Sequence, residues 1–263
     1  MFDIFHPDYL RGEFRAFGAS HFAALFVLLL FCIGFVLWFK KIKNKRVEFI
    51  FCIIVALLTY IQELSRIIWH ISIGDFFLGE HLPFHLCGLG IILGPIMILK
   101  KNYTLYELIY FWGFGGAIQA LLTPDLNWQF PRVIYLQYFI SHGLIIIACV
   151  YMTFVVGYRP TWKSIVKVTC VTYVYLIFII LINIITTENL GIICSKGGTI
   201  WERLEELRQS SGNYLFICRK PANPSLIDIL GPWPWYILSL QGVGIISFLL
   251  YYSPYFVKDI IDR

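Results

Sequence analysis

Charged residues are scarce in this sequence. Only 14% of its 263 residues are Asp, Glu, Lys or Arg, whereas 59% are hydrophobic and 18% are aromatic. Soluble domains carry about 25% charged residues, and the mean hydropathy here is +0.73. A water-soluble globule of this composition would expose too much apolar surface. The composition therefore excludes soluble, disordered and fibrous classes and indicates an integral membrane protein.

Signatures of several other functional classes are also missing. The seven cysteines form no CxxC pair and no closely spaced framework, and a disulfide between Cys194 and Cys218 is the less favoured alternative for those two. The net charge of +5 comes without a basic face interleaved with aromatic residues, so we expect no nucleic-acid partner. The first residues, with Asp3, Asp8 and Glu13, are too polar for a cleavable signal peptide.

Long apolar runs occur seven times along the chain. Each run is continuous rather than alternating, which favours helices over barrel strands, and about 20 residues suffice to cross the hydrocarbon. We therefore expect an all-α, multi-pass protein of the cell membrane, with one polytopic domain over residues 1–263. The expected spans are residues 20–39, 47–71, 82–99, 104–122, 131–156, 164–185 and 235–257.

Basic residues fall in alternate connections. The first, third and fifth connections are basic, whereas the second and fourth carry acidic residues, and cytoplasmic loops are usually the basic ones. This pattern predicts an extracytoplasmic N-terminus and a cytoplasmic C-terminus. The basic residues are Lys40, Lys41, Lys43, Lys45, Arg46, Lys100, Lys101, Arg159 and Lys163, and the acidic ones are Asp75, Glu80 and Asp125.

The sixth connection, residues 186–234, is the only long one and is expected to be extracytoplasmic. Within residues 199–208, Ile200, Leu204 and Leu207 recur at helical spacing with Glu and Arg between them. This pattern predicts a short amphipathic helix on the bilayer surface or on the protein.

Polar residues inside the spans gather towards the expected outer halves. Such residues are costly in a membrane and usually functional, so we expect spans two to seven to surround a polar cavity open to the outer leaflet. For any single residue, interhelical hydrogen bonding is the alternative. The residues are Glu63, Arg66, His70, His85, Cys87, Gln119, Gln137, Ser141, His142, Asn183 and Gln241.

A cysteine and a histidine in this set suggest nucleophilic catalysis. Cys87 has histidines nearby in sequence, and a thiol becomes a useful nucleophile when a base removes its proton. His142 is a candidate base at a comparable depth, with a mismatch of roughly 9 Å at 1.5 Å per residue. Gln119, Asn183 or a backbone N–H could hold the oxyanion. Glu63 and Arg66 could orient polar groups, meet a head group, or form a structural ion pair.

Two other kinds of chemistry remain open at this point. His81, His85 and Cys87, joined by Glu63, His70 or His142, could hold zinc, but no HExxH motif supports this, and we expect neither a metal nor a cofactor. A transporter or lipid-binding protein without chemistry is the other alternative. Glu63 and Arg66 would then be a coupling pair beside residues 113–116, although no inverted repeat supports transport.

Several motifs resemble those of the YwaF-like, or transmembrane protein 164, family. The resemblance covers most of residues 60–240, while residues 188–212 look like an insertion. The motifs are Leu82-Pro-Phe-His-Leu-Cys-Gly-Leu89, residues 111–125 (FWGFGGAIQALLTPD), Phe139-Ile-Ser-His-Gly143, Asn213-Tyr214, Lys220-Pro221 and Leu230-Gly-Pro-Trp-Pro-Trp-Tyr236.

The resemblance implies an enzyme of membrane lipids. Animal members look like acyltransferases that move an acyl chain from a phospholipid to a lysophospholipid, with a Cys and a His carrying the activity. The matching positions are Cys87 and His142. Phospholipid and lysophospholipid are then the expected partners. A distant similarity to membrane hydrolases with a Thr–His pair makes lipid hydrolysis the alternative. Neither the residues nor the resemblance predicts the oligomeric state.

Overall fold

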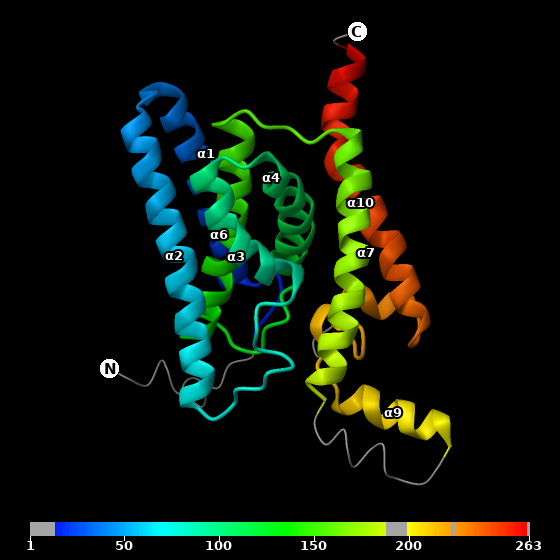
Figure 1. Cartoon of the computed structure of the whole chain (residues 1–263). Coiled ribbons are helices and arrows are strands. Elements are labelled where there is room, and N and C mark those ends of the chain that lie inside the picture. Colours follow the sequence, from blue (N-terminus) through cyan, green and yellow to red (C-terminus); the bar gives the residue numbers. More distant parts are fainter. Residues whose placement is uncertain (1–13, 188–198, 222–224, 262–263) are drawn as a thin grey trace.

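The structure, a computed structural model, describes residues 14–187, 199–221 and 225–261. Within these ranges it is helical and has no strand (Figure 1). Six helical segments are long and apolar enough to cross a membrane, which confirms a multi-pass membrane architecture. They are α1 (Ala19–Ile42), α2 (Lys45–Ser72), Tyr103–Leu122, α6 (Val133–Phe154), α7 (Trp162–Ile185) and α10 (Trp235–Ile261).

The third predicted span is shorter than expected. Helix α3 (Leu86–Lys100) has 15 residues, or about 22 Å at 1.5 Å per residue, against a hydrocarbon core of about 30 Å. It begins at Leu86 rather than Leu82, and the Leu82 N–H donates instead to the Tyr214 hydroxyl at 2.9 Å. The expectation of seven spanning helices thus becomes six, plus one short apolar helix, in the described residues.

The fourth predicted span changes its helical winding midway. It consists of α4 (Tyr103–Ile109), the π-helix η2 (Tyr110–Ala117) and α5 (Ile118–Leu122). Gly113 allows this segment to approach α6, because a Cβ there would lie 2.8 Å from Ile145 Cγ2. The π-helix therefore packs its glycines directly against neighbouring helices, as π segments at functional sites often do.

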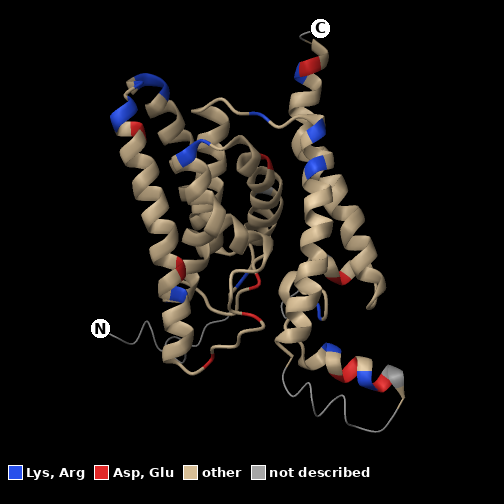
Figure 2. Cartoon of the chain, viewed as in Figure 1, with Lys and Arg blue, Asp and Glu red and all other residues tan. Residues whose placement is uncertain are grey.

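Polar side chains cap the starts of some of the helices, among them α2 and α7. Asn44 accepts hydrogen bonds from the N–H groups of Arg46 (2.9 Å) and Val47 (3.3 Å) at the start of α2. Thr161 and Ser164 form a capping box at the start of α7. The α1–α2, α3–α4 and α6–α7 connections lie at the end of the bundle that holds the C-terminus (Figure 1). Lys and Arg gather at this end (Figure 2).

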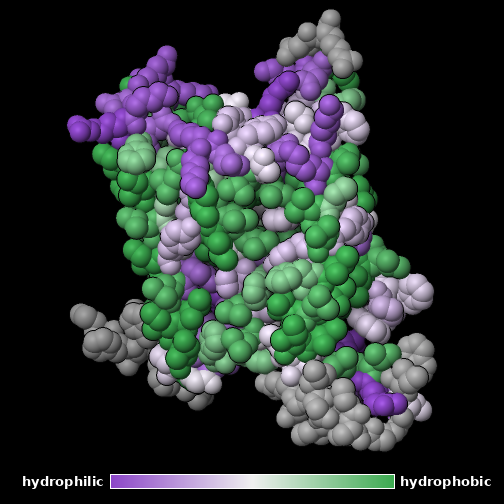
Figure 3. Space-filling model, viewed as in Figure 1, coloured by the Kyte–Doolittle hydropathy of each residue, from purple (hydrophilic) through white to green (hydrophobic). Residues whose placement is uncertain are grey.

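Helices α2, α3, α6 and the π-helix form the packed centre, and α10 packs on the π-helix and on α7. The outward faces of α1, α2, α7 and α10 expose large apolar side chains, among them Phe26, Ile61, Val174, Ile177 and Leu250. Hydrophobic side chains accordingly cover the middle of the molecule in Figure 3, with hydrophilic ones above them. Such a belt suits contact with acyl chains rather than water.

The long connection contains the predicted amphipathic helix. Helix α9 (Ile200–Ser210) starts at Thr199, whose side chain caps Glu202 N–H in a capping box. Two short 3₁₀ segments follow, η3 (Tyr214–Phe216) and η4 (Leu226–Leu230). Cys194, and with it the question of a disulfide, lies outside the described residues, as do residues 188–198 of the predicted insertion.

Candidate active site

A cavity of about 930 Å³ lies among α2, α3, the π-helix, α6, α7, α10 and the connection after α9. Six of the seven predicted site residues line it, namely Cys87, His142, Glu63, Arg66, His85 and Gln119. Its wall also contains the polar side chains Gln137, Ser141 and Gln241, together with apolar residues such as Ile237, Leu240 and Phe248. A cavity of this size, mostly apolar with a few convergent polar groups, is typical of ligand sites.

Cys87 occupies the first turn of α3, immediately after Leu86. Two glycines shape its surroundings. A Cβ on Gly116 of the π-helix would lie 2.8 Å from the Cys87 Sγ, and a Cβ on Gly88 would lie 2.5 Å from the carbonyl carbon of Pro83. Gly88 therefore lets the segment before α3 fold over its first turn, and Gly116 brings the π-helix backbone next to the thiol.

His142 reaches the same cavity from α6. Its Nδ1 lies 2.8 Å from the Tyr138 carbonyl oxygen one turn earlier. When Nδ1–H donates to that carbonyl, Nε2 keeps its lone pair and can accept a proton. The Tyr138 ring packs on the imidazole at 4.4 Å between centroids, and its hydroxyl donates to the Ala120 carbonyl at 2.9 Å. Tyr138 thus contacts the histidine through both its carbonyl oxygen and its ring, and its hydroxyl ties it to Ala120.

Glu63 and Arg66 form an ion pair on one face of α2. Arg66 Nη2 donates to Glu63 Oε1 at 2.6 Å, and Arg66 Nε donates to Oε2 at 3.2 Å. The same Nη2 also donates to the His81 carbonyl at 2.6 Å. The pair therefore ties α2 to the segment that leads to Cys87, with the two side chains 10% and 18% exposed.

His85 stands at the start of α3 as its N-cap residue. Its ring packs edge-on against Tyr214 and lies tilted on Phe216, with centroids 5.4 and 5.3 Å away. His81, by contrast, turns towards His70, whose ring centroid is 3.9 Å away. The structure therefore does not bring His81, His85 and Cys87 together as one set of metal ligands.

Asn183 is the one predicted site residue outside the cavity lining. It is buried near the end of α7, where its Nδ2 donates to the Tyr214 carbonyl at 3.1 Å and its Oδ1 accepts the Tyr214 N–H at 2.9 Å. An amide that satisfies both backbone groups of one residue has a positioning role here. It holds η3 against α7.

Comparison with known proteins places the chain in a family. The TMEM164 family matches residues 16–252, nearly the whole chain. The chain belongs to the TMEM164 family. The resemblance found in the sequence motifs is thereby confirmed.

A curated relative of this TMEM164 family member is described as an uncharacterized protein of Treponema pallidum (strain Nichols). It is 33% identical over 127 residues, which make up 44% of this chain and 48% of the relative. The chain thus spans about half the length of the curated relative it matches. No solved structure matches the chain.

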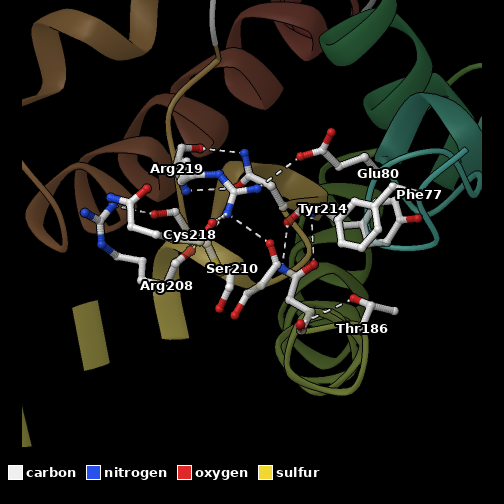
Figure 4. A network of polar contacts seen from close by, with 12 residues as sticks. Phe77, Glu80, Thr186, Arg208, Ser210, Tyr214, Cys218 and Arg219 are labelled. Carbon is white, nitrogen blue, oxygen red and sulfur yellow. Dashed lines mark hydrogen bonds and ion pairs between the residues drawn. The ribbon is translucent and has the colours of Figure 1, made fainter. Parts of the chain in front are cut away.

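Sequence reasoning missed the residues that bind the long connection to the site. Arg219 donates to the carbonyls of Arg208, Gln209 and Ser211 at 2.7–3.0 Å, which satisfies the C-terminal end of α9. It also pairs with Glu80 at 3.0 Å (Figure 4). The family motifs contain Asn213, Tyr214 and Lys220 beside it, but their spacing indicates no role.

Tyr214 lies beside this network (Figure 4). Its side chain is fully buried, and burial raises the pKa of its phenol to about 12. The hydroxyl accepts the Leu82 N–H and donates to the Leu78 carbonyl. Since Leu82 lies five residues before Cys87, Tyr214 sets the path of the chain into α3.

Proposed function

We propose that this protein is an integral membrane acyltransferase that moves an acyl chain between phospholipid and lysophospholipid through a thioester on Cys87. The observation that carries the proposal is that Cys87 and His142, from two different helices, line one cavity. The cavity wall combines apolar side chains for an acyl chain with Lys220, whose charge suits a phosphate head group. The apolar belt around the bundle provides access to lipid.

The first half-reaction transfers the acyl group to the enzyme. His142 Nε2 takes the proton from the Cys87 thiol, and the thiolate attacks the ester carbonyl of a phospholipid. The N–H groups of the first turn of α3, or Gln119, hold the developing oxyanion. The tetrahedral adduct then collapses, the ester C–O bond breaks, and the lysophospholipid leaves with the proton from His142.

The second half-reaction restores the thiol. The hydroxyl of an acceptor lysophospholipid gives its proton to His142 and attacks the thioester carbonyl. The C–S bond breaks, the new phospholipid leaves, and Cys87 recovers its proton from His142. Water in place of the acceptor hydroxyl would give a free fatty acid, so the same residues would act as a hydrolase.

The proposal includes a membrane orientation. We infer that α3 and the non-helical segment before it complete a seventh crossing of the cell membrane. The basic end of the bundle then faces the cytoplasm, with the C-terminus, and the N-terminus and α9 lie outside. The cavity opens near the outer leaflet, because His85 and Tyr214 belong to the end opposite the basic connections.

Turnover by the full chain tests this function. The purified protein, in lipid nanodiscs, is given a phospholipid with an isotope-labelled acyl chain and an unlabelled lysophospholipid. We expect label in the acceptor, and an acyl group on Cys87 that hydroxylamine removes. Cys87→Ser and His142→Gln should each lower transfer at least 100-fold, because losing an activated nucleophile or its base removes the chemical step.

The matched control is Cys170→Ser. Cys170 is exposed on α7 and is not part of the cavity wall, so full turnover is expected. Transfer that persists in Cys87→Ala would contradict the nucleophile assignment. Label found only in free fatty acid would identify a hydrolase. Stoichiometric lipid binding without any turnover would identify a transporter or lipid-binding protein.

A further inference from the structure

A second cluster of side chains that could bind a metal lies at the C-terminal end of α2, away from the basic connections, where the chain turns towards α3. His70 is in the last turn of α2. The chain then reverses at Gly74, which has a φ of +72°, and the Asp75 N–H donates to the His70 carbonyl at 3.0 Å. Glycine is favoured at that φ. The turn therefore returns the Asp75 carboxylate to the side of the His70 ring.

His81 completes the cluster from further along the same connection. One ligand atom from each of His70, Asp75 and His81 lies within 4.8 Å of the other two. His70 Nδ1 and Asp75 Oδ2 are 3.4 Å apart. Two ligands of a tetrahedral zinc ion, each about 2.0–2.1 Å from the metal, are about 3.3 Å apart. That pair thus already has the separation of zinc ligands, and a small movement of His81 brings the third into place.

The His70 ring supplies an independent observation. His70 is only 8% exposed, and its Nδ1 is shielded from solvent without a hydrogen-bond partner. A buried polar atom left unsatisfied costs about 1–3 kcal/mol, and such atoms in native proteins usually have an ion or other group to satisfy them. A cation between His70 and Asp75 would satisfy this nitrogen.

The surrounding charges allow a cation here. Arg66 lies one turn before His70, but Glu63 neutralises it through two hydrogen bonds. The Asp75 side chain is 63% exposed, so a fourth position is open to water. His81 Nδ1 accepts the Phe77 N–H at 2.9 Å and also lies 3.1 Å from the Phe77 carbonyl oxygen. Metal binding through Nε2 requires the other tautomer, in which Nδ1–H donates to that carbonyl, the arrangement common in metal-binding histidines.

We propose that His70, Asp75 and His81 bind one divalent transition-metal ion. The chemistry of these ligands indicates that the ion is zinc. A site with two imidazoles and one carboxylate binds zinc in preference to calcium or magnesium, which favour oxygen ligands. The site departs from the sequence-based expectation of no metal, and it is separate from Cys87. It joins the end of α2 to residue 81 and so holds the segment that Arg66 and Tyr214 also hold before α3.

Zinc titration of the full chain tests the site. The protein is purified in detergent without a polyhistidine tag, stripped with a chelator, and titrated with ZnCl₂ in competition with a chromophoric chelator. We expect one zinc ion per chain. Asp75→Asn, His70→Gln and His81→Asn should each weaken binding at least about tenfold, because each removes a ligand. The matched control His85→Gln, four residues from His81 but outside the cluster, should bind zinc as the natural chain does.

Thermal unfolding gives a second, activity-independent measurement. Zinc should raise the Tm of the natural chain, since a ligand that binds only the folded state stabilises it, and should not raise the Tm of Asp75→Asn. Asp75 is exposed, so this variant keeps its fold in the absence of metal. Zinc binding that is equally tight in a His70→Gln, His81→Asn double variant, or no binding at all, would show the cluster to be only a His–Asp ion pair.

Discussion

The hydroxyl of Tyr214 accepts the backbone N–H of Leu82 at 2.9 Å, across 132 residues of sequence. The same hydroxyl donates to the Leu78 carbonyl, and Asn183 holds the Tyr214 backbone from α7. The Tyr214 side chain thus joins the long connection by hydrogen bonds to the segment that leads into α3. The position of Cys87 depends on a residue that is remote in sequence.

Removal of that hydroxyl should destabilise the protein and misplace the thiol. In Tyr214→Phe, the part-buried Leu82 N–H and Leu78 carbonyl lose their partner, and each lost hydrogen bond costs about 1 kcal/mol. We expect a lower Tm in detergent and a loss of acyl transfer. Tyr60→Phe is the control, because its hydroxyl bonds to the Ile92 carbonyl at an exposed position. Equal stability of the two variants would contradict the role of Tyr214.

A methyl group at Gly116 should impair the site more than the fold. The new Cβ would lie 2.8 Å from the Cys87 Sγ, and the thiol can rotate away at a cost of about 1 kcal/mol. We expect transfer to fall at least tenfold in Gly116→Ala with a small change in Tm. At Gly242 nothing lies within 4 Å of an added Cβ, so Gly242→Ala should leave transfer unchanged. Normal turnover in Gly116→Ala would mean that the thiol position is not critical.

The Glu63–Arg66 pair can be tested as structure or as head-group contact. Arg66→Met leaves the Glu63 carboxylate buried and unpaired, which should cost about 3 kcal/mol. Adding Glu63→Gln should restore most of that loss, as measured by unfolding in detergent. If transfer returns together with stability in the double variant, the pair is structural. Transfer that stays low while stability returns indicates that Arg66 contacts the substrate.

Acid should loosen α9 before the rest of the protein. Hydrogen bonds from Arg208 and Gln209 lower the pKa of Glu205 from 4.5 to about 2. A pKa lowered in the folded state contributes stability that is present above the unfolded value and is lost as pH falls through the folded one. Contacts of α9 should therefore weaken from about pH 4.5 towards pH 2. Amide hydrogen exchange of residues 200–210 measures this, and the pH dependence should be smaller in Glu205→Gln.

Much of the fold could be predicted because hydropathy is local and additive. The predicted runs 20–39, 131–156 and 164–185 correspond to α1, α6 and α7 within a few residues, and the heptad-like spacing of Ile200, Leu204 and Leu207 correctly predicted α9. The third span was predicted four residues too early, since Leu82 and Pro83 are apolar but lie in the non-helical segment that Tyr214 contacts through the Leu82 N–H. The π-helix within 104–122 was not predicted, because its glycines fit several windings.

The candidate site, like the fold, could be predicted from the sequence only in part. Most of the polar residues found in apolar runs, among them Cys87 and His142, line the cavity. The spacing of His81 suggested a metal with His85 and Cys87, but His81 faces His70 and Asp75 instead. Asn183 was expected at the cavity and holds Tyr214. A side chain's direction depends on the turn before it, here at Gly74, and on contacts made by distant segments.

By itself the sequence determined that this chain is a helical membrane protein and which side chains are too polar to face lipid, because burial in hydrocarbon is decided residue by residue. Only the tertiary structure decided which of these polar groups share a cavity, which hold the backbone, and which meet at the end of α2. Those outcomes depend on hydrogen bonds between segments more than a hundred residues apart, such as Tyr214 with Leu82, and no local pattern encodes them.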